Sequence, residues 1–189
     1  MCTYNTFAPN LVSERLTLRP YRPEDAPRVR ALANDIDVAR MVASIPYPYP
    51  EGLAEKWISM HPARHAANTG YPFAIEIDGQ VAGSIGVESE AHGHGTNEFE
   101  LGYWLGREYW GRGYASEAAH AAISFAFEVK GIPYVRARFL RDNRASARVL
   151  TKAGFLATGR YTTFHKVRAC EVEVTATILT RDAWTSNRV

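Results

Sequence analysis

Hydrophobic and polar positions follow two periods along this chain, and each period predicts a class of secondary structure. Alternation at every second position is typical of strands, whereas apolar residues three or four positions apart are typical of one helix face. The helical period is clearest where Ala115, Ala118, Ala119, Ala122 and Ile123 form one apolar stripe. Strands are predicted at 16–18, 73–77, 81–87, 99–105, 134–140 and 171–179, and helices at 23–33, 51–58, 115–127 and 144–153.

Glycine and proline mark where these elements end. Asp78-Gly79 between two alternating segments is a strong signal for a tight hairpin. Three prolines within 45–50 exclude a helix there, because each removes a backbone donor and holds the preceding residue extended. Gly131 and Gly154 follow helical segments and are expected to end them in the left-handed conformation. The order of elements predicts an α/β (α+β) fold, a mixed sheet with helices on both faces.

Composition limits the class of protein. A chain of 189 residues with 46% hydrophobic and 22% charged residues predicts one domain over 1–189, with a core from about 12 to 184, and excludes a disordered chain. The net charge of +2 is too small for a general nucleic-acid-binding surface, and no apolar stretch approaches membrane-spanning length. Cys2 and Cys170 fit neither a metal spacing nor a disulfide framework. We therefore expect a cytoplasmic protein that binds no nucleic acid, membrane or metal.

The segment with the clearest chemistry connects the strand at 99–105 to the next helix. Gly111 and Gly113 precede that helix, where backbone N–H groups converge at the positive end of the helix dipole and favour a phosphate group. The segment has neither the Lys-Ser or Lys-Thr of a P-loop nor the third glycine of a dinucleotide-binding fold. A tight strand-to-helix turn without a ligand is the alternative interpretation.

Several separated segments, in a characteristic order, carry a resemblance to a known family. They are 14–19 (ERLTLR), 83–86 (GSIG), 100–105 (ELGYWL), 109–118 (YWGRGYASEA), 143–146 (NRAS), 152–155 (KAGF) and 179–184 (LTRDAW). In these segments the chain resembles the GCN5-related N-acetyltransferase (GNAT) superfamily, and within it the RimJ/RimL-like ribosomal-protein N-terminal acetyltransferases. The resemblance implies a GNAT-type, mostly antiparallel central sheet and an enzyme that uses acetyl-coenzyme A (acetyl-CoA).

The resemblance also implies which residues bind the cofactor. Four residues of the glycine segment are expected to bind the diphosphate, three residues of the preceding strand to contact the pantetheine arm, and one asparagine to hydrogen-bond the cofactor near that arm. Trp110 stands where the superfamily's loop begins with Gln or Arg, and this change removes no backbone donor. The residues expected to bind the diphosphate are Gly111, Arg112, Gly113 and Ala115. Those expected to contact the pantetheine arm are Tyr103, Trp104 and Leu105, and the asparagine is Asn143.

Two carboxylates and one hydroxyl are the candidates for catalysis. An amine attacks only when neutral, and a pKa of ~8 or ~10 leaves it mostly protonated at neutral pH, so a base is needed. Glu98 and Glu100 share one face of a strand and are the candidate bases, with a solvated face or a structural ion pair as the alternative. Many superfamily members protonate the leaving thiolate with a tyrosine, whose position holds Leu150 here. Ser146 resembles the subgroup's Asn-x-x-Ser pattern and is expected to assist the thiolate, unless it only bonds a helix carbonyl.

The sequence indicates the acceptor site less clearly than the cofactor site. Tyr47 and Tyr49 lie where the subgroup has its acceptor-binding loop, so the resemblance implies that they line the amine pocket; a proline-stiffened surface turn is the alternative. His165 and Cys170 are expected to pack in the core or at the rim of that pocket. The segment His92-Gly93-His94 lacks a third metal ligand nearby and is expected to be a solvated loop.

These observations together predict an N-acetyltransferase that works by direct attack in a ternary complex. We expect a protein or peptide N-terminal α-amine as the acceptor. The alternatives are a small amine, such as a polyamine, an amino acid or a drug, and a non-catalytic acyl-CoA sensor. The sequence leaves open which of Glu98 and Glu100 is the base, and whether the protein is a monomer or a homodimer.

Overall fold

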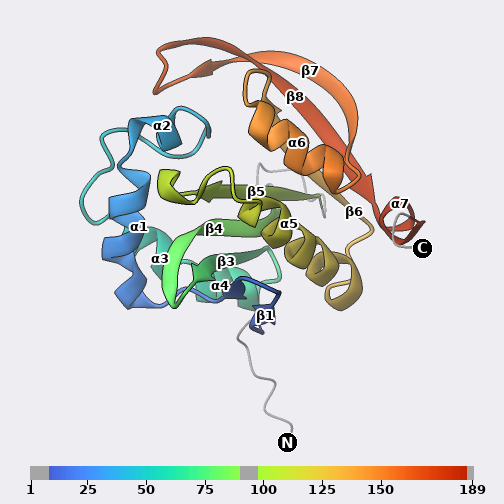
Figure 1. The fold of residues 1–189 in the computed structure, drawn as a ribbon, viewed down its shortest axis with the longest axis horizontal. Coiled ribbons are helices and arrows are strands. Elements are labelled where there is room, and N and C mark those ends of the chain that lie inside the picture. The colour runs from blue at the N-terminus through green and yellow to red at the C-terminus, as the bar shows by residue number, and fades with distance from the viewer. Residues whose placement is uncertain (1–8, 90–97, 187–189) are drawn as a thin grey trace, which may run out of the picture.

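The fold is built on one eight-stranded mixed sheet, in a computed structural model that describes residues 9–89 and 98–186. The strands are β1 (Leu11–Val12), β2 (Thr17–Arg19), β3 (Gly70–Ile77), β4 (Gln80–Ser89), β5 (Phe99–Leu105), β6 (Tyr134–Leu140), β7 (Leu156–His165) and β8 (Cys170–Thr180). Their spatial order is β1-β2-β3-β4-β5-β6-β8-β7 (Figure 1). Neighbouring strands are antiparallel except β5 and β6, which are parallel. The predicted mostly antiparallel mixed sheet is confirmed.

Helices cover both faces of this sheet (Figure 1). They are α1 (Ala26–Ala33), α2 (Ile36–Ala39), α3 (Leu53–Ser59), α4 (His61–Ala66), α5 (Tyr114–Ser124), α6 (Arg144–Lys152) and α7 (Arg181–Ser186). On one face α1 and α3 bury apolar residues against β3 and β4. On the other face α5 and α6 bury theirs against the central strands. None of the helices within residues 9–89 and 98–186 combines the length and the apolar character that crossing a membrane requires.

Most of the predicted elements are present at their expected places. Asp78 and Gly79, with φ of 49° and 75°, join β3 to β4 in the predicted tight hairpin. Gly131 and Gly154 have φ of 69° and 91°, and each follows a helical segment as expected. Two differences stand out: α3 begins at Leu53 rather than at residue 51, and the long strand β7 is absent from the prediction.

The sheet splits between its two parallel strands. Within the described residues, β5 and β6 pair only through Phe99 with Val135 and Glu100 with Arg136. Both strands continue for several residues beyond this point, β5 to Leu105 and β6 to Leu140. The remaining length of β5 therefore keeps its β4 partner but leaves its other edge open toward β6.

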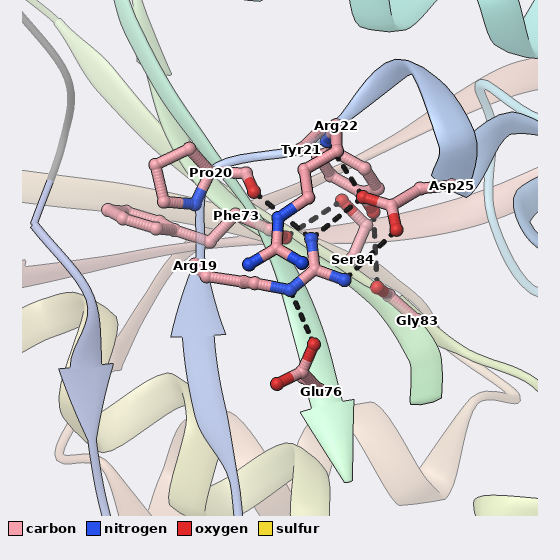
Figure 2. Close-up of polar contacts among 9 residues, drawn as sticks. All are labelled: Arg19, Pro20, Tyr21, Arg22, Asp25, Phe73, Glu76, Gly83 and Ser84. Atoms are coloured by element: carbon pink, nitrogen blue, oxygen red, sulfur yellow. Dashed lines mark hydrogen bonds and ion pairs between the residues drawn. The ribbon is translucent and has the colours of Figure 1, made fainter. Parts of the chain in front are cut away.

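A buried ion cluster connects the short strand β2 to the start of α1. Arg19 at the end of β2 donates to both carboxylate oxygens of Asp25, at 2.7 and 2.9 Å, and also to Glu76 on β3 (Figure 2). Burial opposes ionisation of Asp25, but the hydrogen bonds from Arg19 and from the N–H of Arg22 hold the pKa of Asp25 below its usual value. The cluster joins β2, β3 and the entry to α1 in one charged contact.

The tip of the β7–β8 hairpin crosses to the segment after α2. Arg168 donates to the carbonyl of Arg40 at 2.8 Å and pairs with Asp142 at 2.6 Å. A further contact joins its guanidinium to the sulfur of Met41 at 3.7 Å. In Figure 1 the hairpin accordingly arches above α6 toward α2. One arginine therefore holds three chain segments around the split in the sheet.

Candidate active site

A cleft of about 950 Å³ passes through the split between β5 and β6. Neighbouring β5 residues face different helices across it. The hydroxyl of Tyr103 lies 2.8 Å from the hydroxyl of Ser146 on α6, whereas Trp104 packs against the apolar cluster of α1 and α3. Both Tyr103 and Trp104 line the cleft. The cleft therefore reaches both faces of the sheet, and two ligands have room to meet from opposite faces.

The glycine turn before α5 presents unpaired backbone N–H groups. Gly111 and Gly113 adopt φ of 74° and 84°, which glycine accepts without steric cost. Counting from Gly111 along the chain, the first N–H group with a backbone hydrogen-bond partner is that of Ser116, which donates to the Gly113 carbonyl. Among the residues that the structure describes, no acceptor faces the N–H groups of residues 111–115, which include Ala115. This is the arrangement that binds a phosphate at a helix N-terminus.

Arg15 holds this turn in place. Its guanidinium donates to the carbonyl of Arg112 at 3.0 Å and to the carboxylate of Glu117 in α5 at 2.8 Å. Ser13 donates to the same carboxylate at 2.7 Å. Burial opposes ionisation of Glu117, but the hydrogen bonds from Arg15 and Ser13 lower its pKa. Arg15 thus holds the turn through the Arg112 carbonyl, which leaves the N–H groups of the turn available to a ligand.

Asn143, Ser146 and Tyr103 form a polar group on the α6 side of the cleft. Asn143 caps α6 by accepting from the N–H of Ser146 at 3.0 Å, and its amide nitrogen donates to the Met41 carbonyl at 3.4 Å. Burial raises the pKa of Tyr103 to about 12, with the Ser146 hydrogen bond opposing the shift. Tyr103 is therefore protonated at neutral pH. The Ser146 hydroxyl bonds this tyrosine, not a helix carbonyl, among the described residues.

The two candidate bases lie on one strand face but in different surroundings. Glu98 pairs with Arg136 at 2.9 Å and accepts from the hydroxyl of Tyr134 at 3.3 Å. Glu100 pairs with Arg138 at 2.7 Å. Both carboxylates are thus in ion pairs, as the alternative interpretation expects, but only Glu100 of the two lines the cleft.

The other predicted residues also differ in whether they line the cleft. Tyr49 is buried and lines the cleft, and its N–H donates to Asn34, whereas Tyr47 is 45% exposed and is not part of the lining. Leu105 is buried just beyond the β5 residues that line the cleft. Leu150 is fully buried in the core.

The C-terminal candidates take separate places. His165 is 4% exposed and contributes to the lining, which matches the expected packing, and Cys170 is exposed. Burial and the nearby Arg168 lower the pKa of His165. No group of three or more His, Cys, Asp or Glu side chains within the described residues is arranged to hold a metal ion. The segment 92–94 lies outside the described residues.

Sequence analysis missed four charged residues of the cleft, which are Arg64, Glu88, Arg138 and Lys166. Glu88 on β4 is the direct cross-strand partner of Glu100, and Arg64 of α4 pairs with Glu88. Both line the cleft. A polar residue at the end of an otherwise apolar strand was the available signal, but only the pairing of β4 with β5 places Glu88 beside Glu100.

Comparisons with known proteins agree with this geometry. The family profile described as the acetyltransferase (GNAT) domain matches residues 15–156. The N-acetyltransferase YoaA of Bacillus subtilis strain 168 is 30% identical over 153 residues, covering 80% of this chain and 85% of that protein. The spermidine N(1)-acetyltransferase of Escherichia coli K12 is 29% identical over 145 residues, covering 75% and 73%.

Solved structures share the fold. A RimL ribosomal L7/L12 α-N-protein acetyltransferase in complex with coenzyme A superposes with a TM-score of 0.82 at 19% identity, over 93% of this chain and 99% of that one. Mycobacterium smegmatis RimJ, also with a coenzyme A species, gives a TM-score of 0.76 at 21% identity, over 88% and 82%. The split sheet and its cleft thus define an acyltransferase fold. The chain belongs to the GNAT acetyltransferase family, and it is an N-acetyltransferase.

Proposed function

We propose that this enzyme transfers the acetyl group of acetyl-CoA to a primary amine by direct attack in a ternary complex. One observation carries the proposal: the cleft passes through the split between β5 and β6 and so connects both faces of the sheet. A cofactor on the α5 and α6 face and an amine on the other face then meet in one place. Holding two reactants in this way replaces a bimolecular encounter with an oriented one.

The cofactor is proposed to lie along the open edge of β5. Its diphosphate binds the free N–H groups of residues 111–115 at the positive end of α5. The pantetheine arm runs past Tyr103, whose neighbours on β5 have no β6 partner beyond Glu100. Asn143, which lines the cleft, is placed to hydrogen-bond this arm. The complexes of similarly folded RimL and RimJ with coenzyme A species support this placement.

The chemical step needs a base on one face and a proton donor on the other. The neutral amine nitrogen attacks the thioester carbonyl carbon, the tetrahedral intermediate collapses, and the carbon–sulfur bond breaks to release the thiolate. Glu100 takes the proton from the ammonium, directly or through a water molecule. The Tyr103–Ser146 hydroxyl pair, which stays protonated at neutral pH, donates to the departing thiolate.

For the acceptor we propose an N-terminal α-amine of a protein or peptide. The fold shared with RimL, an acetyltransferase of a ribosomal-protein α-amine, supports it. Similarity to spermidine N(1)-acetyltransferase favours a small-molecule amine as the second candidate. Tyr49 and the apolar residues around it form the wall of the cleft on the acceptor side.

Calorimetric titration with acetyl-CoA, combined with an assay of thiol release, tests the proposal. Wild-type protein is expected to bind acetyl-CoA, and the Gly113→Val variant is expected to lose at least about tenfold in affinity, because a β-branched side chain blocks the approach of phosphate to the backbone. The matched control is Gly131→Val, since Gly131 also has a positive φ but follows a helical segment instead of preceding α5.

Both variants strain the backbone in the same conformation, so a similar loss of stability is expected in each. Only Gly113→Val is expected to lose the cofactor. Absence of heat and thiol release with the wild type would contradict the proposed function. Equal affinity in the two variants would show that the glycine turn does not bind the diphosphate.

A further inference from the structure

The floor of the cleft is a trough formed by one face of β4 and β5. Three cross-strand pairs make it up, and all six residues line the cleft: Ser84 with Trp104, Gly86 with Gly102, and Glu88 with Glu100. Cross-strand partners point to the same face of a sheet, and every second residue returns to that face. We call this surface the β4–β5 trough. It has a carboxylate pair at one end, two glycines in the middle and an aromatic ring at the other end.

The carboxylate end carries two like charges side by side. Glu88 is the direct partner of Glu100, an arrangement that is unfavourable unless cations balance it. Arg64 pairs with Glu88 and Arg138 pairs with Glu100, each from its own side. The two carboxylates remain partly accessible, at 36% and 22% side-chain exposure. An ammonium group between them would relieve the repulsion that remains.

This end of the trough is also where the sheet splits. Glu100 pairs with Arg136 in the last rung between β5 and β6. An ammonium held by Glu88 and Glu100 therefore lies beside the opening through which the proposed thioester is reached. The remaining body of the acceptor must then extend along β5, away from this rung.

The middle of the trough is open at Gly102. Among the described residues, a Cβ built on Gly102 meets no heavy atom within 4 Å, so the missing side chain leaves free space above β5 there. The neighbouring glycine differs, because a Cβ on Gly86 would lie 3.0 Å from the Cα of Pro72. Gly86 is required by the packing of the sheet. Gly102 is required by nothing in the fold around it, and its space is available to a ligand.

The far end is apolar and carries no carboxylate. Trp104, Tyr49 and Trp57 bring aromatic rings to the lining at this end. Of the described residues that line the cleft, only Glu88 and Glu100 are acids, whereas Arg64, Arg138 and Lys166 are basic. Trp104 lies four residue steps along the strand from Glu100, or about 13 Å. A second ammonium group at that distance would find aromatic rings and no opposite charge.

We infer that the β4–β5 trough binds an acceptor with a single ammonium group on an uncharged, largely apolar body, with Glu88 and Glu100 at the amine and Gly102 setting the permitted bulk. The inference rests on the proposed function and narrows its substrate class. Peptide N-termini with apolar first residues and small arylalkylamines share this chemistry. A polyamine does not.

The experiment compares acetyl transfer to alanyl and methionyl peptides, phenethylamine and spermidine, together with calorimetric binding of each amine. Gly102→Val is expected to lower kcat/KM for the mono-cationic amines by about tenfold or more, mainly through KM, while the affinity for acetyl-CoA changes less than about twofold. The matched control is Gly159→Val on β7, because Gly159 also has open space at its Cβ but lies outside the cleft.

Glu88→Gln is the second variant and is expected to raise KM for the mono-cationic amines by roughly fivefold. Its control is Glu173→Gln, which also breaks an arginine ion pair but lies outside the cleft. Peptides and phenethylamine are assayed separately, and the comparison shows whether the acceptor is a peptide N-terminus or a small amine.

Three outcomes would overturn the inference: unchanged kinetics in Gly102→Val, equal effects in Gly102→Val and Gly159→Val, or spermidine as the best acceptor. If acetyl transfer is unchanged in Gly102→Val, the proposed function still holds, and only the assignment of the trough as the acceptor site is contradicted. Conversely, mono-cationic amines that bind the wild type but not Gly102→Val, without any acetyl transfer, support the trough and contradict the proposed function.

Discussion

Glu100 is the residue at which the split sheet, the cleft and an ion pair meet. It belongs to the last rung between β5 and β6, lines the cleft and pairs with Arg138 at 2.7 Å. The negative charge of this carboxylate attracts a cationic amine. In the proposed mechanism the same carboxylate then receives the proton that the amine must lose before it attacks.

Glu100→Gln should therefore lower kcat by about a hundredfold near neutral pH, with little change in the affinity for acetyl-CoA. The defect should shrink as the pH rises toward the amine pKa of ~8 or ~10, because the acceptor then deprotonates without a base. A pH profile of kcat and kcat/KM measures this. Glu98→Gln, two residues away and outside the lining, is the comparison and should cost far less. A defect in Glu100→Gln that is constant across the pH range would contradict proton transfer.

Residue patterns alone identified only part of the site. Glu100 and Ser146 were predicted from spacing and resemblance, and both line the cleft. Glu88 was missed because its place beside Glu100 depends on the register of β4 with β5, which a single sequence does not specify. The hydroxyl of Tyr103, the proposed proton donor, was not predicted because its contact with Ser146 depends on how α6 packs.

At the scale of elements, the Arg19 cluster joins β2, β3 and the entry to α1. The side chains of Arg19 and Asp25 are only 6% and 9% exposed, and Glu76 completes the cluster (Figure 2). Arg19→Met should destabilise the protein by about 3–5 kcal/mol, because it leaves a buried carboxylate without its cation. Urea unfolding at neutral pH measures this change.

An exposed arginine provides the comparison for this cluster. Arg141, 64% exposed, pairs with Glu173, and Arg141→Met should change the free energy of unfolding by less than about 1 kcal/mol. Similar small losses in both variants would show that the Arg19 cluster contributes no more than a surface ion pair. In that case another contact must hold α1 against β2.

Elements differed in how well the sequence predicted them. The β3–β4 hairpin was predicted because Asp78-Gly79 lies between two alternating segments and both residues adopt positive φ. β7 was missed because nine of its ten residues are exposed, so it has no buried face to produce an alternating pattern. It is an edge strand that pairs only with β8 within the described chain, and this pairing does not depend on a hydrophobic pattern.

At the scale of the whole molecule, the sequence predicted the family, the sheet and an amine pocket near Tyr49 and His165, but not that the cleft passes through a split in the sheet. The cleft arises because β5 and β6 separate after Glu100, and because Arg168 holds the β7–β8 hairpin against the segment after α2. Both features depend on contacts between residues far apart in the sequence, 36 positions for Glu100 with Arg136 and 128 positions for Arg168 with Arg40. Local patterns carry no information about such pairs.

The stability of the whole domain should depend on a buried histidine. His61 at the start of α4 is 4% exposed and packs edge-on against Tyr21 and Trp57, with ring centroids 5.2 and 4.4 Å away. Neither ring nitrogen has a hydrogen-bond partner among the described residues. Burial, together with the positive charge of Arg64, lowers the pKa of His61 to about 4. The folded state therefore holds this ring neutral.

The pKa of His61 is lower in the folded state than its value of ~6.5 in the unfolded chain. Between these two pKa values the unfolded chain therefore binds a proton at His61 and the folded chain does not. The stability that the neutral ring supports is complete above the unfolded pKa and is lost as the pH falls toward 4, by at most about 3 kcal/mol. His61→Phe keeps the aromatic packing and removes the titration. Urea unfolding of both proteins between about pH 7.5 and about pH 4.5 should show the wild type losing more stability than the variant. Other titrating groups are common to both proteins and cancel in the comparison. Parallel pH profiles would mean that the His61 ring gains a proton partner in the folded state and is not held neutral by burial.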